Sequence, residues 1–147
     1  MNHEITILGN PRPQIRHKYT RKGNFISTYD PSSYDKKKFK KKVLKFAPKE
    51  PLKANISLVL IFHMKRPQAH FKTKDGKLTF KLKDWAEKIR YSACKKDIDN
   101  LAKFVLDACN EVLWYDDKYV VELQCRRVYT REDEKPRTEM EFWLVKD

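Results

Sequence analysis

The most apolar stretch of the chain, Asn-Ile-Ser-Leu-Val-Leu-Ile-Phe-His at residues 55–63, decides the fold. It carries no acidic, lysine or arginine side chain and is rich in β-branched and large aliphatic residues, which predicts a buried central strand. Pro48 and Pro51 separate it from the preceding segment, because proline interrupts regular structure. We therefore expect the other elements to pack around this strand.

The segment before the central strand predicts a strand, a hairpin and a helix. Residues 4–8 alternate as a short strand does, and the basic, aromatic stretch 14–29 contains Gly23-Asn24, which is typical of a hairpin tip. Residues 34–46 predict a lysine-rich helix. Its expected buried stripe consists of Phe39, Val43 and Phe46.

The segment after the central strand predicts a polar surface excursion at residues 65–96 and then a helix at 99–112. Residues 119–129 and 138–145 predict two strands that pair with each other as a hairpin. This order of elements predicts one α+β domain over residues 1–147, with a mixed β-sheet and two main helices.

The positive charge is unevenly distributed. Of a formal net charge of +13, residues 1–54 contribute +10 and residues 55–96 contribute +8, whereas residues 97–147 contribute −5. An excess of this size indicates a polyanionic partner. A chain that only coats nucleic acid does not need an acidic final third, so these carboxylates require a separate explanation.

Several classes of protein are disfavoured. The first ten residues lack the pattern of a secretory signal, and the longest apolar run, residues 58–62, is too short to span a membrane. Three cysteines without a C-x-x-C pair, and histidines without ligand spacing, do not indicate a zinc site. We expect an intracellular protein that does not enter membranes.

The segment Asp97-Ile98-Asp99-Asn100-Leu101-Ala102-Lys103 carries the most chemical information. If residues 97–99 are extended, Asp97 and Asp99 project to one side, and Asp99 is well placed as a helix N-cap. The later Asp116-Asp117 pair offers a third ligand. Oxygen-only ligands suit Mg²⁺ or Mn²⁺ and phosphodiester hydrolysis, in which Lys103 has several possible roles.

Each of these carboxylates also has a purely structural interpretation. Asp99 can serve only as an N-cap, and Asp107 can pair with Lys103 at the i,i+4 spacing. Asp116-Asp117 can form only a turn before a strand. Taken together, acidic residues at both ends of one helix in a basic chain favour a metal site.

The sequence resembles the RusA family of Holliday junction resolvases, the crossover junction endodeoxyribonucleases. The resemblance is carried by the run from Asp97 to Lys103 and by Asp116-Asp117, and it extends upstream to Gly9-Asn10-Pro11-Arg12-Pro13 and Arg66-Pro67. Two departures stand out. Lys96 replaces the usual proline before the first aspartate, and Glu111-Val112-Leu113 replaces a glycine-containing turn.

The resemblance implies that Asp97, Asp99 and Asp117 bind the metal and that Lys103 is the catalytic lysine, with the choice between Asp116 and Asp117 open. It also implies a homodimer that makes paired nicks in four-way or branched DNA. The basic part of the chain would then bind phosphates. The expected DNA-binding residues are Arg12, Arg16, Lys18, Arg21, Lys22, Lys37, Lys38, Lys41 and Arg66.

The leading hypothesis is therefore a Mg²⁺-dependent, structure-selective endodeoxyribonuclease of DNA recombination and repair, cytoplasmic and nucleoid-associated, encoded by a bacterium or phage. One alternative is a basic nucleic-acid-binding protein without catalysis, for which the positive charge alone is sufficient. Another is a nuclease of the same chemistry with looser substrates, such as flaps or forks. Divalent-metal-dependent strand scission separates the first hypothesis from the binding protein.

Overall fold

The apolar stretch that decides the fold lies inside a four-stranded sheet. In the computed structural model, which describes residues 2–147, the strand order is β1-β8-β4-β7. The strands are β1 (Asn2–Leu8), β4 (Ile56–Met64), β7 (Val120–Tyr129) and β8 (Arg137–Leu144). β4 runs parallel to β7, whereas β8 is antiparallel to both β4 and β1. The predicted mixed sheet of an α+β domain is confirmed.

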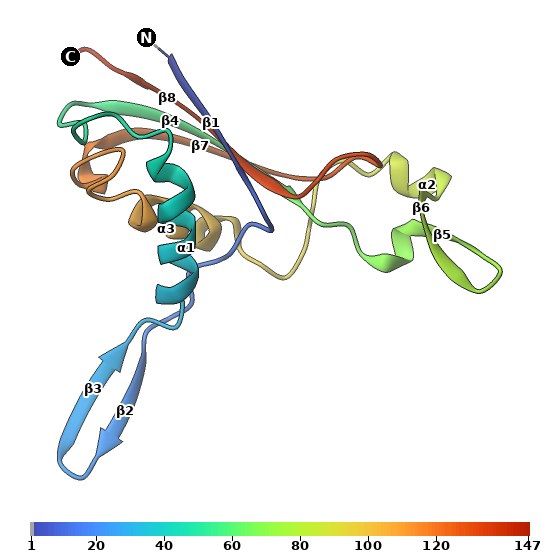
Figure 1. The fold of residues 1–147 in the computed structure, drawn as a ribbon, viewed down its shortest axis with the longest axis horizontal. Helices are drawn as coiled ribbons and strands as arrows, with labels where there is room; N and C mark the ends of the chain where they lie inside the picture. Colours follow the sequence, from blue (N-terminus) through green and yellow to red (C-terminus); the bar gives the residue numbers. More distant parts are fainter. Residues whose placement is uncertain (1) are drawn as a thin grey trace.

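Two helices cover one face of this sheet, α1 (Ser33–Leu44) and α3 (Ile98–Ala108) (Figure 1). The two helices meet at Phe39 and Phe104, whose rings form an edge-to-face pair with centroids 5.7 Å apart. Burial of apolar side chains supplies the main driving force for this packing. Between the sheet and the helices lie alternate side chains of β4 and the inward-facing side chains of α3. All of them are buried: Ile56, Leu58, Leu60, Phe62, Leu101, Val105 and Ala108.

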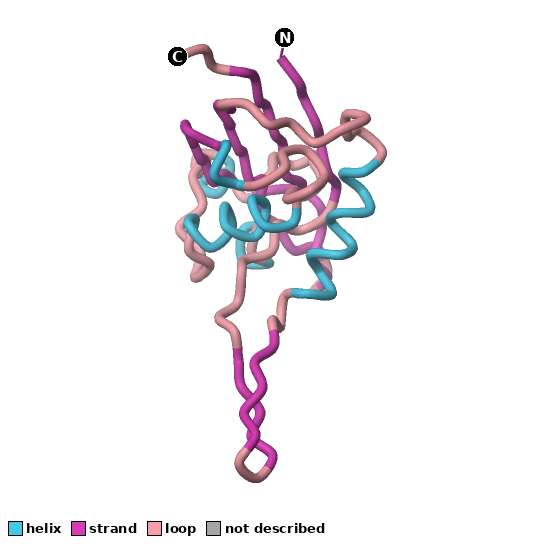
Figure 2. Tube along the Cα trace, turned by 90° about the vertical axis from the view of Figure 1, so that its left-hand side faces the viewer, coloured by secondary structure: helices cyan, strands magenta, loops and turns pink. Residues whose placement is uncertain are grey.

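Two hairpins project from the body and form separate two-stranded sheets. The first, β2 (Lys18–Lys22) with β3 (Phe25–Tyr29), extends far below the helices, and every residue of both strands is exposed (Figure 2). The second, β5 (Phe71–Lys74) with β6 (Lys77–Leu82), leads into the short helix α2 (Asp84–Glu87). Two single 3-10 turns, Gln68–His70 and Asp117–Tyr119, complete the regular structure of residues 2–147.

The predicted hairpin between the last two strands is wrong. β7 and β8 each pair with β4, which lies between them. As the most apolar strand, β4 takes an interior position, where both of its edges are paired and one of its faces is covered by the helices. The chain passes from β4 through α3 to the parallel strand β7, and β8 then returns on the other side of β4.

Two local predictions also need correction. Phe46 lies beyond the end of α1 and is 54% exposed, so the buried stripe of this helix consists of Val43 and the partly buried Phe39. Asp97, rather than Asp99, occupies the N-cap position of α3, and residues 98 and 99 are already helical. Asp97 and Asp99 therefore do not share a side in the way that an extended segment would require.

Two remaining features are the state of the cysteines and the capacity of the helices to cross a membrane. Cys109 is buried and Cys94 and Cys125 are partly buried, all as free thiols. Among residues 2–147, the helices are all too short or too polar to cross a bilayer.

Candidate active site

One face of α3 presents alternating charge to solvent. Asp99, Lys103 and Asp107 follow each other at intervals of four residues, so they lie along one stripe of the helix, and all three are exposed. The opposite face carries Leu101 and Val105 into the core. Because that apolar face fixes the rotation of the helix, the charged stripe is held in one direction.

The turn after α3 brings a further carboxylate back to this stripe. Trp114 is completely buried, and its indole Nε1 donates a hydrogen bond to the carbonyl of Leu106 at 3.3 Å. Glu111 has a φ of 63°, and its backbone N–H donates to the carbonyl of Trp114 at 2.7 Å. This tight turn places residues 116 and 117 beside the last part of the helix.

The adjacent aspartates Asp116 and Asp117 have different surroundings. The Asp116 carboxylate caps the following 3-10 turn by accepting a hydrogen bond from the Lys118 N–H at 2.9 Å. Asp117 instead lines a surface hollow together with Lys103 and Asp107. Of the two positions between which the sequence left a choice, Asp117 is therefore the one that faces the charged stripe of α3.

The hollow has a volume of about 280 Å³, and its other wall is the loop before β2. Gln14, Ile15, Arg16 and His17 supply this wall. The loop is fastened to the helix, because the Gln14 backbone N–H donates to the carbonyl of Asn100 at 2.9 Å. A basic loop and a carboxylate-bearing helix thus meet around one open space.

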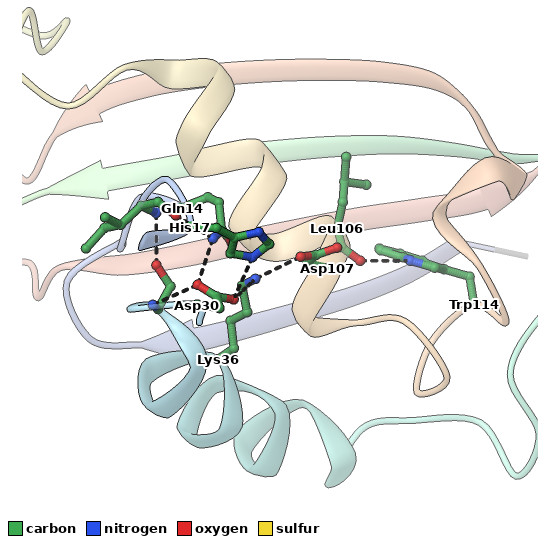
Figure 3. A network of polar contacts seen from close by, with 9 residues as sticks. Gln14, His17, Asp30, Lys36, Leu106, Asp107 and Trp114 are labelled. Carbon is green, nitrogen blue, oxygen red and sulfur yellow. Dashed lines mark hydrogen bonds and ion pairs between the residues drawn. The ribbon is translucent and has the colours of Figure 1, made fainter. Parts of the chain in front are cut away.

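A polar network surrounds the base of the β2–β3 hairpin (Figure 3). Asp30, at the end of that hairpin, accepts hydrogen bonds from the Gln14 side chain at 3.0 Å and from the Ser32 backbone N–H at 2.9 Å. His17 lies 3.9 Å from the other oxygen of Asp30. The hairpin is therefore held at its base beside the hollow, although its strands are free.

Lys36 connects this network to α3. Its ammonium lies 2.7 Å from a carboxylate oxygen of Asp30 and 2.8 Å from one of Asp107, and its side chain is only 13% exposed. Although burial opposes the charged form, hydrogen bonds to Asp107 and Asp30 hold the pKa of Lys36 above its ordinary value. Sequence reasoning missed this residue, because nothing distinguishes it from the neighbouring lysines of α1.

The carboxylates around the hollow repel one another. Partial burial, together with the neighbouring Asp116 and Asp107, raises the pKa of Asp117 above its ordinary value. A bound cation would relieve this repulsion, since it would favour the ionised form of each carboxylate. The expected pairing of Asp107 with Lys103 is not formed, because Asp107 pairs with Lys36.

The predicted metal ligands have the chemistry that a divalent metal requires. Asp97, Asp99 and Asp117 offer carboxylate oxygens, which Mg²⁺ prefers. In position they do not converge: within residues 2–147, no group of three His, Cys, Asp or Glu side chains is arranged to hold a metal ion. Asp97 and Asp99 also do not line the hollow that contains Asp117.

Eight of the nine expected DNA-binding residues lie on the surface. They are Arg12, Arg16, Lys18, Arg21, Lys22, Lys37, Lys38 and Lys41, from the loop before β2, the first hairpin and α1. Arg66 differs from them because it is only 5% exposed and donates hydrogen bonds to backbone carbonyls, including those of Ala86 and Thr130. These hydrogen bonds give Arg66 a structural role, and its expected contact with DNA stays a prediction.

Comparison with known proteins gives two matches. The family model described as Endodeoxyribonuclease RusA matches residues 9–142. An uncharacterized protein of Bacillus subtilis (strain 168), YqaN, is 28% identical over 142 residues, which cover 93% of this chain and 92% of that protein. The family match includes the hollow, α3 and two of the four sheet strands in full, β4 and β7.

Proposed function

The chain belongs to the RusA family of endodeoxyribonucleases, and from this premise we propose that it is a divalent-metal-dependent nuclease that resolves Holliday junctions by paired nicks. The proposal assigns it to the recombination and repair of DNA in a bacterium or phage. Four-way or otherwise branched DNA is the proposed substrate, and Mg²⁺ the proposed cofactor, with Mn²⁺ as a substitute.

The observation that carries this proposal is the hollow in which Lys103 and Asp117 face Arg16. An acidic group beside two basic groups suits a phosphodiester whose charge must be held while a water molecule attacks it. A module that only binds DNA gains nothing from carboxylates that repel phosphate. Their position inside a basic surface therefore favours catalysis over simple binding.

The residues of the site have separate proposed roles. Asp97, Asp99 and Asp117 are the proposed metal ligands, and because they do not converge in this structure, holding one ion would require them to move closer together. A bound metal would lower the pKa of a water molecule and neutralise phosphate charge. Lys103 stabilises the additional negative charge on the phosphate in the transition state. Arg16 binds the phosphate from the opposite wall of the hollow. The backbone N–H of Gln14, which donates to the carbonyl of Asn100 in α3, holds this wall in place.

The basic elements around the hollow hold the rest of the DNA in this proposal. Lys37, Lys38 and Lys41 form an exposed row on α1, and Lys18, Arg21 and Lys22 lie on the first hairpin. Most of these side chains are lysines, which bind phosphate as point charges rather than reading bases through paired hydrogen bonds. Selection of the substrate by its shape is therefore expected.

We also propose that the enzyme works as a homodimer, because paired nicks in a junction of approximate twofold symmetry require two equivalent sites. The outer edge of β7 supports self-association, since Val121 and Leu123 are about half exposed there. Light scattering of the purified protein tests this part of the proposal. A mass of twice 17.7 kDa is expected, whereas a monomer at working concentrations contradicts it.

Incubation of the protein with a synthetic four-way junction tests the function. With Mg²⁺ or Mn²⁺ we expect symmetric nicks near the branch point, no nicks in EDTA, and no cleavage of a linear duplex of the same sequence. Cleavage of flaps and forks at the same rate as junctions would favour a looser branched-DNA nuclease. Binding without scission in either metal would overturn the proposal in favour of a DNA-binding protein.

A further inference from the structure

The second hairpin, β5 with β6, has no role in the function proposed above. It belongs to the segment between β4 and α3 that the sequence predicts only as a surface excursion. Lys74-Asp75-Gly76-Lys77 closes the hairpin with a two-residue turn in which both central residues, Asp75 and Gly76, have positive φ values of 53° and 73°. Such turns match the twist of the strands and favour a defined hairpin.

Arg66 ties together the segments next to this hairpin. The buried guanidinium donates to the carbonyls of Thr130 at 2.5 Å, Ala86 at 2.7 Å and Ile89 at 3.0 Å. It also lies against the ring of Tyr129, 5.3 Å from its centroid. One side chain thus joins the end of β7, α2 and the segment after α2. The end of the hairpin is held separately, because the Leu82 backbone N–H donates to the Glu132 carboxylate at 3.1 Å.

The projecting part of the hairpin combines positive charge with an exposed aromatic ring. Residues 71–82 contain four lysines and one aspartate. Phe80 is 88% exposed, more than any other large hydrophobic residue that the structure describes. Lys72 and Lys81 have carboxylates of Asp84 and Glu132 within 4 Å, whereas Lys74 and Lys77, on either side of the turn, have none among residues 2–147.

A hairpin that holds a phenylalanine in water and carries free lysines at its turn fits one kind of partner best. Unpaired nucleobases stack on aromatic rings, while the adjoining phosphates attract ammonium groups. A second copy of the same hairpin is disfavoured because like charges would face each other. A fully paired duplex satisfies the lysines but not the ring, because its bases are stacked on one another. The chemistry therefore indicates nucleic acid with bases out of their stack.

The hairpin is also linked to the candidate active site. The chain that leaves it runs through residues 88–96 directly to Asp97, and Arg127 fixes this segment by donating to the carbonyls of Ser92, at 2.7 Å, and Lys96. The two hairpins leave the body at different sides, β2–β3 below α1 and α3 and β5–β6 at the other end of the molecule (Figure 1).

We propose that the β5–β6 hairpin is a second DNA-binding arm, in which Phe80 stacks on an unpaired base at a branch point and Lys74 and Lys77 bind the adjoining phosphates. The inference rests on the proposed function, since it takes branched DNA as the partner. It adds a way to distinguish a branch from a plain duplex, which charge alone does not provide.

The test measures binding in EDTA, so that cleavage plays no part. The probes are a DNA fork with 2-aminopurine as an unpaired base at its branch point and a linear duplex of equal length. Phe80→Ala should weaken fork binding by roughly 5- to 150-fold, the equivalent of about 1–3 kcal/mol per stacked base, and should leave duplex binding within about twofold. The quenching of 2-aminopurine seen with the wild type should disappear.

Matched variants separate stacking from charge and from folding. Phe80→Tyr keeps a ring and should bind the fork as the wild type does. Lys74→Gln with Lys77→Gln should weaken both DNAs and reduce the slope of log affinity against log salt by about 2. Circular dichroism of Phe80→Ala should match the wild type, because the exposed ring contributes little to the core.

Each result bears on the inference. Fork binding and 2-aminopurine quenching by Phe80→Ala equal to those of the wild type would overturn it, and so would equal losses on fork and duplex. If the wild type binds no branched DNA, the proposed function fails. If the wild type binds and cleaves branched DNA while Phe80→Ala does so equally well, only the inference about the second arm fails.

Discussion

Lys36 and Asp107 form an ion pair between α1 and α3, with 2.8 Å between the ammonium nitrogen and a carboxylate oxygen. The same ammonium lies 2.7 Å from Asp30 at the base of the first hairpin. One lysine therefore joins the first hairpin, the lysine-rich helix and the helix of the candidate active site. Its role differs from that of the exposed lysines beside it.

Replacement of Lys36 by Met should destabilise the protein by about 1–2 kcal/mol, because two partly buried carboxylates lose their partner while solvent still screens the half-exposed Asp107. Urea unfolding followed by circular dichroism measures this change. The control is Lys37→Met, in the next and exposed position of the same helix, which should change stability by less than about 0.5 kcal/mol. Equal effects of the two substitutions would mean that the network contributes nothing.

Replacement of Glu111 by Gly should stabilise the protein by about 1 kcal/mol. Glu111 has a φ of 63°, which is strained for a residue with a Cβ atom and natural for glycine. This is also the turn in which the sequence departs from the glycine-containing pattern of its family. Thermal unfolding checks the prediction, and Glu111→Val should have the opposite effect, because a β-branched residue tolerates this conformation poorly. A lower melting temperature for the glycine variant would contradict it.

Acidification should weaken the base of the second hairpin. Burial, together with the charges of Arg66 and Lys83, lowers the pKa of His70 below its ordinary value of 6.5. The unfolded chain therefore takes up the proton first, so stability is complete above about pH 6.5 and falls as the pH drops toward the lower pKa of the folded state.

His70→Phe isolates this effect, because it keeps a ring for the edge-to-face contacts with Trp85 and Tyr129. Urea unfolding at about pH 7.5 and pH 5.5 should show a larger loss of stability in the wild type than in the variant. The other histidines are common to both proteins and cancel in the comparison. The same loss in both would show that His70 does not titrate in this range.

The elements of the fold follow from local patterns, whereas their pairing does not. The inner face of α3 is buried along its whole length. Its apolar residues therefore recur with the helical period, and this period in residues 99–112 predicts the helix. Val121 and Leu123 of β7 are about half exposed at the sheet edge. Pairing of β7 with β4 rather than β8 depends on which strand gains most from the interior position, and this is a property of the whole sheet.

The candidate site shows the same division. Lys103 follows Asp99 by four residues, so the sequence motif alone places both side chains on one side of the helix. The approach of Gln14 to Asn100 joins segments that are far apart in sequence, and no local pattern records it. The three backbone carbonyls that Arg66 contacts are equally invisible in the sequence, because they belong to segments far from residue 66.

The central claim is that carboxylates beside α3 perform the chemistry while the basic elements hold the DNA. Asp99→Asn tests it most directly, because the substitution keeps the shape of the side chain and removes only its charge. Scission and binding are measured on the same four-way junction, with scission in Mg²⁺ and binding in EDTA.

We expect junction cleavage to fall by at least about 100-fold, in line with the loss of a metal ligand, while junction affinity stays within about threefold of the wild type. Lys103→Met should likewise reduce cleavage more than binding. Unchanged cleavage by Asp99→Asn, or an equal loss of cleavage and binding in a folded protein, would contradict the claim.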